Sequence, residues 1–324
     1  MSQNIPLKLR DWIDIEKLDW RNLNYNPNAI ELLQKNPDKI NHYILTDNPN
    51  PNMVDILKNY LNEFNGIEWY DLFTNPNAIH IIEKNMHMLF QNDSLWNALS
   101  MNPNAIHILK QYPDKISFKG LSLNTNPDAI QILEENYEKI HWPNLCSNPN
   151  GIHLIERRLT EPYIPEIDFL DFRSERPYKN ISWITLSGNP NAIHILEQNI
   201  DYIYWLTISE NKNALHILKQ HPEKISYQGL CKNTNPEAIE ILENNLEFIF
   251  WSILSENPNA IDLLEANKDK LYYKNLSKNP NIFIYDYEKM CQNHKELKEE
   301  IIQKAWHPDR VAKWIELGID LDDL

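Results

Sequence analysis

The stretch Asn102-Pro103-Asn104-Ala105-Ile106-His107-Ile108-Leu109 decides the fold of this chain. Asparagine followed by proline is a favourable helix start, because asparagine caps the first turn and proline has the φ angle that the first helical position needs. At 100° per residue, the four apolar residues from Ala105 to Leu109 fall on one face and His107 points away. The phrase predicts a short helix with one apolar face, here named helix B.

The same phrase, or a close variant, recurs along the chain and defines eleven units. Its proline is Pro27, Pro51, Pro76, Pro103, Pro127, Pro149, Pro190, Pro236, Pro258 or Pro280, and Lys212 stands in its place in one unit. The period is about 22 to 24 residues, with one longer interval after the sixth unit. Residues 112–156 also match residues 221–265 at an offset of 109, which indicates the duplication of a block of four units. This self-similarity is typical of a repeat protein.

A second helix, helix A, is predicted in each unit. Asn36-Pro37-Asp38 and Tyr112-Pro113-Asp114 are start signals with an acid in the first turn. Helix A carries an aromatic residue three positions before a Leu or Ile, and only the second unit departs from this, with His42. The aromatic position holds Trp20, Trp69, Trp96, Phe118, Trp142, Trp183, Trp205, Tyr227, Trp251 and Tyr273. We expect these rings to pack between units, although rings in a row can also stack on bases or sugars.

The units predict an all-α fold, an α-solenoid of about eleven helical hairpins of 22–24 residues, because a single hairpin cannot bury its apolar face alone. The alternative is a leucine-rich-repeat-like α/β solenoid, which has a similar period. That repeat needs an apolar residue two positions before the Leu, where this chain has Arg21, Asn97, Lys119 and Gln228. The sequence therefore favours paired helices.

The two ends of the chain lack the repeat phrase and are expected to cap the solenoid, whose terminal units would otherwise expose a core face. We expect an N-terminal cap over residues 1–17, the repeats over 18–284 and a helical cap over 285–324. The last segment predicts a longer helix, Glu288 to Lys304, and a second one, Arg310 to Leu317, closed by Gly318.

Composition excludes several classes of function. The net charge of −15 disfavours broad nucleic-acid binding, and 6 glycines leave little material for a phosphate-binding loop. Cys146, Cys231 and Cys291 form no CxxC or Cys/His cluster, so neither a disulfide framework nor a metal site is expected. We find no acid, base and nucleophile outside the repeat pattern, and expect no cofactor and no enzyme. The N-terminus has no apolar signal region and no stretch predicts a membrane span, so a chain that is not secreted is expected.

The outward position of helix B is polar in every unit where it can be assigned. It holds Glu31, Asp55, His80, His107, Gln131, His153, His194, His216, Glu240 and Asp262. Neighbouring helices lie 8–10 Å apart, too far for these histidines to share a zinc ion. We expect a solvated stripe, with a pH-responsive or partner-contacting stripe as the alternative.

One segment, about residues 157–179, is an insertion that the repeat does not explain. It is rich in arginine and aromatic residues, the types enriched at binding hot spots, and long insertions emerge on one face of a solenoid. It is the candidate partner-binding site, and the alternative is a tolerated surface insertion. Its candidate residues are Arg157, Arg158, Tyr163, Phe169, Phe172, Arg173, Arg176 and Tyr178.

The recurring NPNAIxxLExN with W/Y/FxxLS, together with the closing AWHPDRVAKWIELGIDLDD, resembles uncharacterised repeat proteins encoded by giant DNA viruses of amoebae. The resemblance spans about residues 18–318 and implies a viral source and a repeat architecture, with no activity attached to any residue. A non-enzymatic scaffold for an unidentified protein partner is expected, in the cytoplasm of a host cell or in a virion. The alternatives are a self-associating structural component of a viral particle or factory and a single-stranded nucleic-acid reader.

Overall fold

The computed structural model describes residues 5–64, 66–162, 170–171, 176–177 and 180–316. The chain divides into two compact units, Asp14–Ile282 and a unit formed by both ends, Met1–Ile13 with Phe283–Leu324. Helices dominate the described residues, which confirms the all-α prediction and excludes the α/β alternative. Within this part of the chain, no helix is long and apolar enough to cross a membrane.

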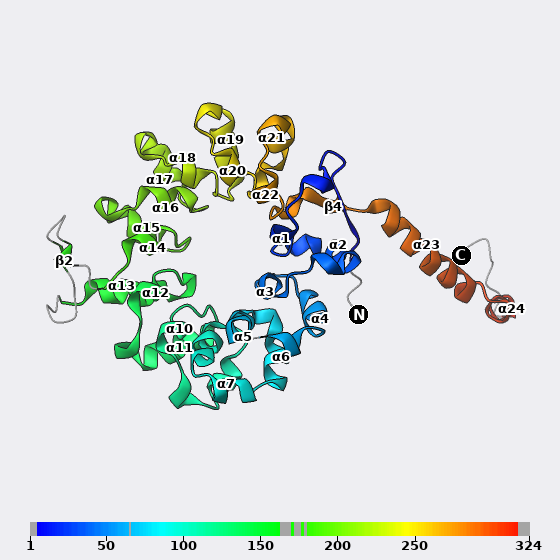
Figure 1. Ribbon diagram of the computed structural model, residues 1–324, viewed down its shortest axis with the longest axis horizontal. Helices are drawn as coiled ribbons and strands as arrows, with labels where there is room; N and C mark the ends of the chain where they lie inside the picture. Colours follow the sequence, from blue (N-terminus) through cyan, green and yellow to red (C-terminus); the bar gives the residue numbers. More distant parts are fainter. Residues whose placement is uncertain (1–4, 65, 163–169, 172–175, 178–179, 317–324) are drawn as a thin grey trace. The chain divides into compact units, whose positions relative to one another are not determined.

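Helix A is present in all eleven repeats and lies on the inner side of the repeat unit (Figure 1). In nine of these repeats helix A begins at the aromatic position itself, and the residue before it often caps the helix. The A helices are α1 (Trp20–Leu23), α3 (His42–Leu45), α5 (Gly66–Thr74), α8 (Ser94–Met101), α10 (Phe118–Leu121), α12 (Trp142–Leu145), α14 (Trp183–Ser187), α16 (Trp205–Glu210), α18 (Tyr227–Leu230), α20 (Trp251–Leu254) and α22 (Tyr273–Leu276).

Helix B follows in ten repeats and lies on the outer side (Figure 1). In the eleventh, the turn Pro280–Ile282 leads into strand β4 (Phe283–Tyr285) instead. An extra helix, α7 (His87–Gln91), precedes α8. The B helices are α2 (Ile30–Lys35), α4 (Met53–Leu57), α6 (Ile79–Lys84), α9 (Ile106–Leu109), α11 (Pro127–Glu135), α13 (Ile152–Thr160), α15 (Ile193–Glu197), α17 (Leu215–Gln220), α19 (Pro236–Glu243) and α21 (Ile261–Ala266).

The prediction that a second proline begins helix A is wrong. Pro37 and Pro113 begin separate 3-10 turns, Pro37–Lys39 and Pro113–Lys115, and each turn ends at an isoleucine with extended backbone. Helix A begins only after that isoleucine, so a typical repeat contains a turn, helix A, the asparagine phrase and helix B.

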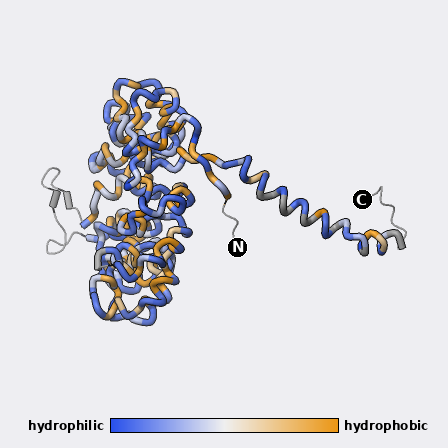
Figure 2. The backbone as a smooth tube through the Cα atoms, turned by 45° about the vertical axis from the view of Figure 1, so that its right-hand side comes forward, coloured by the Kyte–Doolittle hydropathy of each residue, from blue (hydrophilic) through white to orange (hydrophobic). Residues whose placement is uncertain are grey.

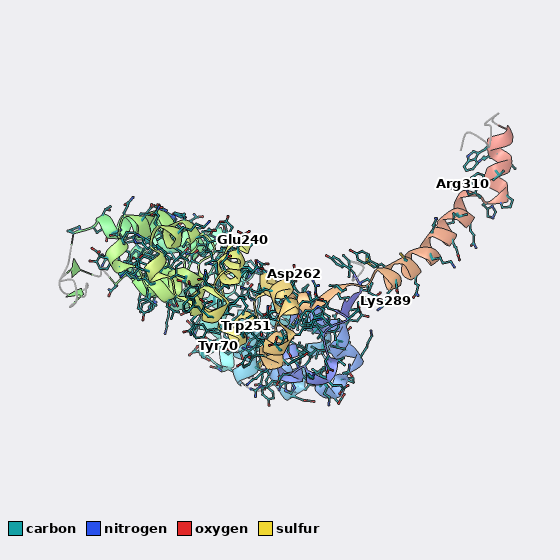
Figure 3. The ribbon with its side chains drawn as sticks, turned by 90° about the horizontal axis from the view of Figure 1, so that it is seen from above. Tyr70, Glu240, Trp251, Asp262, Lys289 and Arg310 are labelled. Carbon is teal, nitrogen blue, oxygen red and sulfur yellow. The ribbon has the colours of Figure 1, made fainter. Side chains whose placement is uncertain are left out.

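The core is built by the apolar faces of both helices. The Leu or Ile three positions after the aromatic is completely buried in every repeat, as in Leu23 and Leu145. Figure 2 shows hydrophobic positions recurring around the repeat unit. The aromatic rings pack beside them: Trp142 is 8% exposed, and the remaining rings at this position, such as Trp251 (Figure 3), are buried or half-buried. The burial of these rings therefore fits the prediction that they pack between units.

One buried asparagine per repeat, here named the ladder asparagine, binds the preceding repeat. Asn124 donates from Nδ2 to the carbonyls of Ser100 and Asn102, both at 2.9 Å, and its Oδ1 accepts the N–H of Asn126. The ladder asparagines are Asn26, Asn48, Asn75, Asn102, Asn124, Asn148, Asn189, Asn211, Asn233, Asn257 and Asn279. Buried amides paired in this way fix the position of each repeat on the last.

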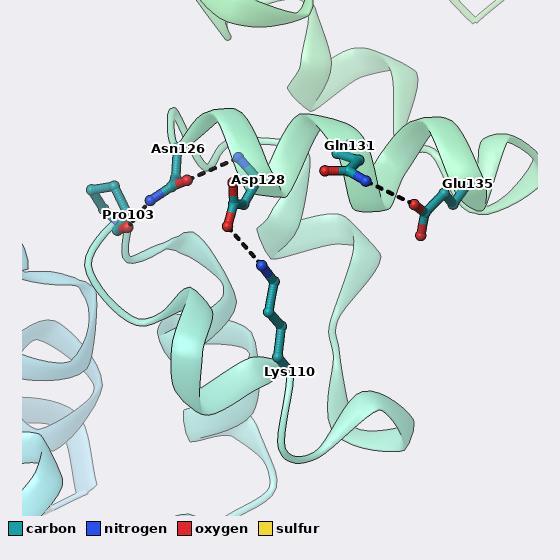
Figure 4. Close-up of polar contacts among 6 residues, drawn as sticks. All are labelled: Pro103, Lys110, Asn126, Asp128, Gln131 and Glu135. Atoms are coloured by element: carbon teal, nitrogen blue, oxygen red, sulfur yellow. Dashed lines mark hydrogen bonds and ion pairs between the residues drawn. The ribbon is translucent and has the colours of Figure 1, made fainter.

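This ladder corrects the sequence alignment in three units. The ladder residues there are Asn48, Asn124 and Asn233, each two positions before the asparagine of the Asn-Pro pair that defined the unit. These repeats carry two additional residues between the ladder asparagine and the first buried apolar pair of helix B, such as Ala129-Ile130. The asparagine two positions after the ladder residue makes a second inter-repeat bond, as Asn126 does to the Pro103 carbonyl at 2.7 Å (Figure 4).

The eleventh repeat binds the first through the same bonds, so the unit Asp14–Ile282 closes on itself (Figure 1). Asn26 donates to the carbonyls of Ser277 and Asn279, both at 2.9 Å. The other bonds of this closing joint are Asn28 Nδ2 to the Pro280 carbonyl at 2.9 Å, Asp19 N–H to Ser277 Oγ at 2.8 Å and Asn22 Nδ2 to the Lys274 carbonyl at 2.6 Å. The first and last repeats cover each other, so the exposed end faces on which the capping prediction rested do not exist.

The unit formed by both ends has its own pairing. Strand β1 (Leu7–Leu9) runs antiparallel to β4, with Lys8 opposite Ile284. After β4 the chain continues into α23 (Tyr287–Ala305) and α24 (Pro308–Glu316). The two predicted C-terminal helices are therefore present, and the predicted closing residue Gly318 lies outside the described residues.

Candidate partner-binding surface

Most of the insertion predicted to bind a partner lies outside the described residues. This applies to Tyr163, Phe169, Phe172, Arg173 and Tyr178. The backbone of Arg176 belongs to strand β3 (Arg176–Pro177), which pairs with β2 (Leu170–Asp171).

Arg157 and Arg158, at the start of the insertion, take part in contacts within repeat 6. Arg158 is 5% exposed, its Nη1 lies 2.8 Å from Glu161 Oε2, and its guanidinium lies 5.5 Å from the Trp142 ring. Arg157 lies 4.1 Å from the ring of Tyr137, whose hydroxyl donates to Glu161 at 2.7 Å. Arg158 thus packs inside the repeat, while Arg157 keeps an exposed side chain.

The carboxylate of Glu161, which accepts hydrogen bonds from both Tyr137 and Arg158, has a shifted pKa. Burial tends to raise the pKa of Glu161, but hydrogen bonds from Tyr137 and Arg158 outweigh it and lower that pKa. Burial, followed by the bond to Glu161, raises the pKa of Tyr137. The cluster holds the end of α13 on its own repeat.

A position three residues before the aromatic, the covering position, lies over the ring of the preceding repeat. Lys139 Nζ is 4.9 Å from the Phe118 ring centroid, Lys270 is 4.7 Å from Trp251, and Lys17 is 5.4 Å from Tyr273 across the closing joint. Two other joints have a ring there instead: Tyr202 stacks on Trp183 at 4.5 Å and Phe248 stacks on Tyr227 at 4.7 Å. The ring ladder is thus covered by cations in some joints and by aromatics in others.

The residue directly before the aromatic, the capping position, separates the repeats into two groups. Six of these residues accept the N–H three positions later, namely Asp19, Asn41, Ser117, His141, Ser182 and Ser226. Tyr204, Phe250 and Tyr272 stand there in repeats 8, 10 and 11, and these three make no side-chain capping bond. In repeats 3 and 4 the position lies inside a longer helix.

These three aromatic residues are exposed, and other apolar side chains accompany them. Tyr204 is 44% exposed, Phe250 48% and Tyr272 54%; Leu206 and Phe248 are 37% and 49% exposed. We name these five residues the aromatic patch. The ring position alone does not reveal this patch; the signal in the sequence is the loss of Asp, Asn, Ser or His one residue earlier.

A groove lies between repeats 9 and 10 at this surface. Its volume is about 500 Å³. The rings of Tyr227, Phe248 and Phe250 line it together with one carboxylate, that of Glu247. The remaining lining residues are Ser226, Gln228 and Ile249.

Four of the five outward histidines of helix B bind the repeat before them. His107 Nε2 lies 3.0 Å from Glu83 Oε1, and His153, His194 and His216 make matching pairs with Glu134, Glu156 and Glu197 at 2.6–2.8 Å. Lys110 and Asp128 bridge the intervening joint at 2.7 Å (Figure 4). The stripe is mostly exposed, as expected, but half-exposed side-chain contacts join its residues to the neighbouring repeats. Among the described residues, no group of three or more His, Cys, Asp or Glu side chains is placed to hold a metal.

Cys146 and Cys231 replace serine at a position two before the ladder asparagine. Ser122 Oγ there accepts the N–H of His141 at 3.1 Å, and the sulfur of Cys146 is buried at the equivalent position of the next repeat. Burial raises the pKa of Cys146 to about 12 and also raises that of Cys231. Neither thiol is suited to act as a nucleophile.

Comparison of the chain with protein-family models, with curated proteins and with solved structures found no match.

Proposed function

We propose that this protein is a non-enzymatic repeat scaffold that binds another protein through the aromatic patch. The observation that supports this is the presence of Tyr204, Phe250 and Tyr272 where other repeats have capping side chains. Loss of a cap destabilises a helix by about 1 kcal/mol, and a ring that stays about half exposed recovers only part of this through its own burial. Tyrosine and phenylalanine that are buried by a partner do contribute to binding, which is why aromatic residues are enriched at interfaces.

The insertion is the second contact region of this proposal. Arg157 has 60% of its side chain exposed and lies where the insertion leaves α13. The predicted hot-spot residues that lie beyond it, from Tyr163 to Tyr178, would extend the contact. Arg158 is left out of this region because its guanidinium is buried against Glu161.

The experiment compares partner recovery by cross-linking in host cells. A triple variant, Tyr204→Ser, Phe250→Ser and Tyr272→Ser, converts the three capping positions to the residue of repeat 9. Its control replaces the exposed Tyr43 and Phe90, 49% and 61% exposed, by serine. We expect wild type and control to recover the same partner and the triple variant to lose it. Equal recovery by all three would remove the aromatic patch from the proposal.

A deletion tests the insertion separately. Removing residues 162–178 keeps Glu161, so the contacts of Arg158 remain and the repeats should stay folded. Wild type and the deletion variant are compared at the same concentration of folded protein. If the deletion recovers less partner than wild type, the insertion provides part of the contact. Unchanged recovery would confine the contact to the repeats.

Self-association is a second candidate, favoured by exposed apolar residues in the unit formed by the two chain ends. Trp306 is 48% exposed and packs at 6.3 Å on Trp314 of α24, and Ile302 of α23 is 47% exposed. Light scattering decides between the candidates. A monomer mass of 38.5 kDa at all concentrations supports the scaffold proposal, and a larger particle that returns to this mass in Trp306→Ser supports self-association.

The viral source belongs to the same proposal, since the resemblance to repeat proteins of giant DNA viruses is its support. The partner would then be met in the host cytoplasm or in the virion. A nucleic-acid reader is disfavoured because the chain carries a net charge of −15. We expect no binding to random single-stranded RNA at moderate salt, whereas tight and salt-sensitive binding would contradict the scaffold proposal.

A further inference from the structure

The groove between repeats 9 and 10 differs from the equivalent joints in what covers the ring. In three joints a lysine of the chain itself lies over the aromatic of the preceding repeat, at 4.7–5.4 Å. Those distances are typical of cation–π contacts. The fold therefore already uses the faces of these rings to hold cations.

In the groove, Phe248 takes the place of that lysine. Its ring stacks on Tyr227, and Phe250 stands two residues further on at the rim. The seven lining residues include neither lysine nor arginine, and the only charge among them is the carboxylate of Glu247. Within the described part of the chain, Glu247 forms no ion pair, and its side chain is exposed. The groove thus has aromatic faces and a negative charge without a cation.

We infer that this groove receives an arginine side chain from a basic segment of the protein partner. The inference rests on the proposed scaffold function and names its partner class. Arginine fits because its planar guanidinium stacks on aromatic faces while donating hydrogen bonds, here to Glu247, Gln228 or Ser226. The net charge of −15 attracts a basic segment over a longer range.

A first experiment uses a defined probe, a fluorescein-labelled peptide of four Gly-Arg repeats, and measures its fluorescence anisotropy with the full chain at physiological salt. A peptide with citrulline in place of arginine has nearly the same shape without the charge. We expect the arginine peptide to bind and the citrulline peptide to bind at least tenfold more weakly. Equal affinity for the two peptides would overturn the inference.

Two variants test the site with matched controls. Glu247→Gln removes the groove charge, and its control Glu138→Gln removes the charge at the same position of the duplicated block. Phe248→Lys recreates the arrangement of Lys139 over Phe118, so a cation of the chain itself should then occupy the ring face in the groove. Its control, Ser252→Lys, adds the same charge in repeat 10 at a position that is lysine in two other repeats. We expect a five- to tenfold loss of affinity in the groove variants and less than a twofold loss in the controls, as one cation–π contact and one ion pair predict.

A gain-of-function variant checks that the named residues are sufficient. Lys119→Gln, Lys139→Phe and His141→Phe together copy the groove into the joint between repeats 5 and 6, and the number of peptides bound should rise by one. An unchanged number would show that these positions do not make the site.

The outcomes separate this inference from the scaffold proposal. If Glu247→Gln and Glu138→Gln weaken the arginine peptide equally, binding follows the overall charge and the inference fails. The scaffold proposal would still stand or fall on partner recovery by the triple serine variant. If that variant keeps its partner while the groove variants lose the peptide, the scaffold proposal fails on the aromatic patch and the groove remains an arginine site.

Discussion

The duplicated blocks, 112–156 and 221–265, are built on one backbone and carry different surfaces. Each has a 3-10 turn, Tyr137–Lys139 or Leu246–Phe248, followed by helix α12 or α20. In each, a ladder asparagine, Asn148 or Asn257, donates to two carbonyls of the repeat before it.

The copies differ at the covering and capping positions. The first block has Lys139 over a ring and His141 as a helix cap, and the second has Phe248 and Phe250, both half-exposed. The ladder asparagines that join the repeats are the same in both copies, whereas residues at the rim of the joint differ. The residues within the joints therefore determine the architecture, and the residues at the rim can change to form a binding surface.

The largest expected effect comes from the two tryptophans at the aromatic position. Trp142 is 8% exposed and contacts buried Arg158, while Trp251 is half-buried beneath Lys270. Trp142→Ala should lower the free energy of unfolding by about 3–5 kcal/mol and Trp251→Ala by about 2 kcal/mol. Urea denaturation measures both. A larger loss for Trp251→Ala would show that the second copy is packed at least as tightly as the first.

The ladder asparagines should matter equally in both copies. Asn148→Ala and Asn257→Ala each leave two buried carbonyls without their donor and remove a helix cap, so we expect a loss of about 2–4 kcal/mol from either change. The same urea denaturation applies. A difference of more than about 1 kcal/mol between the two would contradict a shared joint.

A smaller effect, with a pH dependence, is expected at His141. Burial, followed by the charge of Lys119, lowers the pKa of His141 in the folded chain below the 6.5 of an unfolded histidine. The unfolded chain therefore takes up this proton more readily, and the contribution of His141 to stability is lost as the pH falls through about 6.5. At pH 7.5, His141→Ala should remove about 1 kcal/mol of capping energy.

The check on His141 is the difference in stability between wild type and His141→Ala at two pH values. That difference should be largest at pH 7.5 and shrink by pH 5.5, because protons then bind the unfolded chain more readily than the folded one, in which Nδ1 accepts the N–H of Asn144. A difference that stays constant across this range would show that protonation does not disturb the cap.

The smallest expected effect is a gain. Phe250→Ser gives α20 the cap that Ser226 gives α18, so the variant should be more stable by about 0.5–1 kcal/mol. Thermal unfolding should shift upward by about 1–4 °C. A destabilised variant would show that Phe250 is a packing residue and would remove the main support for the proposed function.

Much of the fold could be predicted from the repeated phrase. The Asn-Pro start, the apolar face from Ala105 to Leu109 and the spacing of aromatic and leucine follow from capping and helical periodicity alone, and the structure has them in place. The register error at Asn48, Asn124 and Asn233 arose because Asn-Pro is the stronger local signal, while the ladder role of the earlier asparagine depends on carbonyls of another repeat.

Closure could not be predicted in this way. Whether eleven repeats meet depends on a small rotation per repeat, which no single phrase encodes. Asn26 has the same sequence context as other ladder asparagines, and only the structure shows that its acceptors lie in repeat 11. The aromatic patch was missed for a simpler reason, since Tyr204, Phe250 and Tyr272 interrupt a capping pattern that is visible in the sequence.

The central claim is that repeat 1 is packed on repeat 11 as on a covalent neighbour. Pulsed electron spin resonance tests it with spin labels at Arg21 and Lys274, which are exposed and occupy equivalent positions in repeats 1 and 11. A reference pair, Ser252 and Lys274, occupies the same positions in adjacent repeats 10 and 11, and Cys291→Ser removes the exposed native thiol in both. The account predicts the same distance distribution for the two pairs. A clearly longer distance between labels at 21 and 274 would contradict closure and return the repeats to an open solenoid.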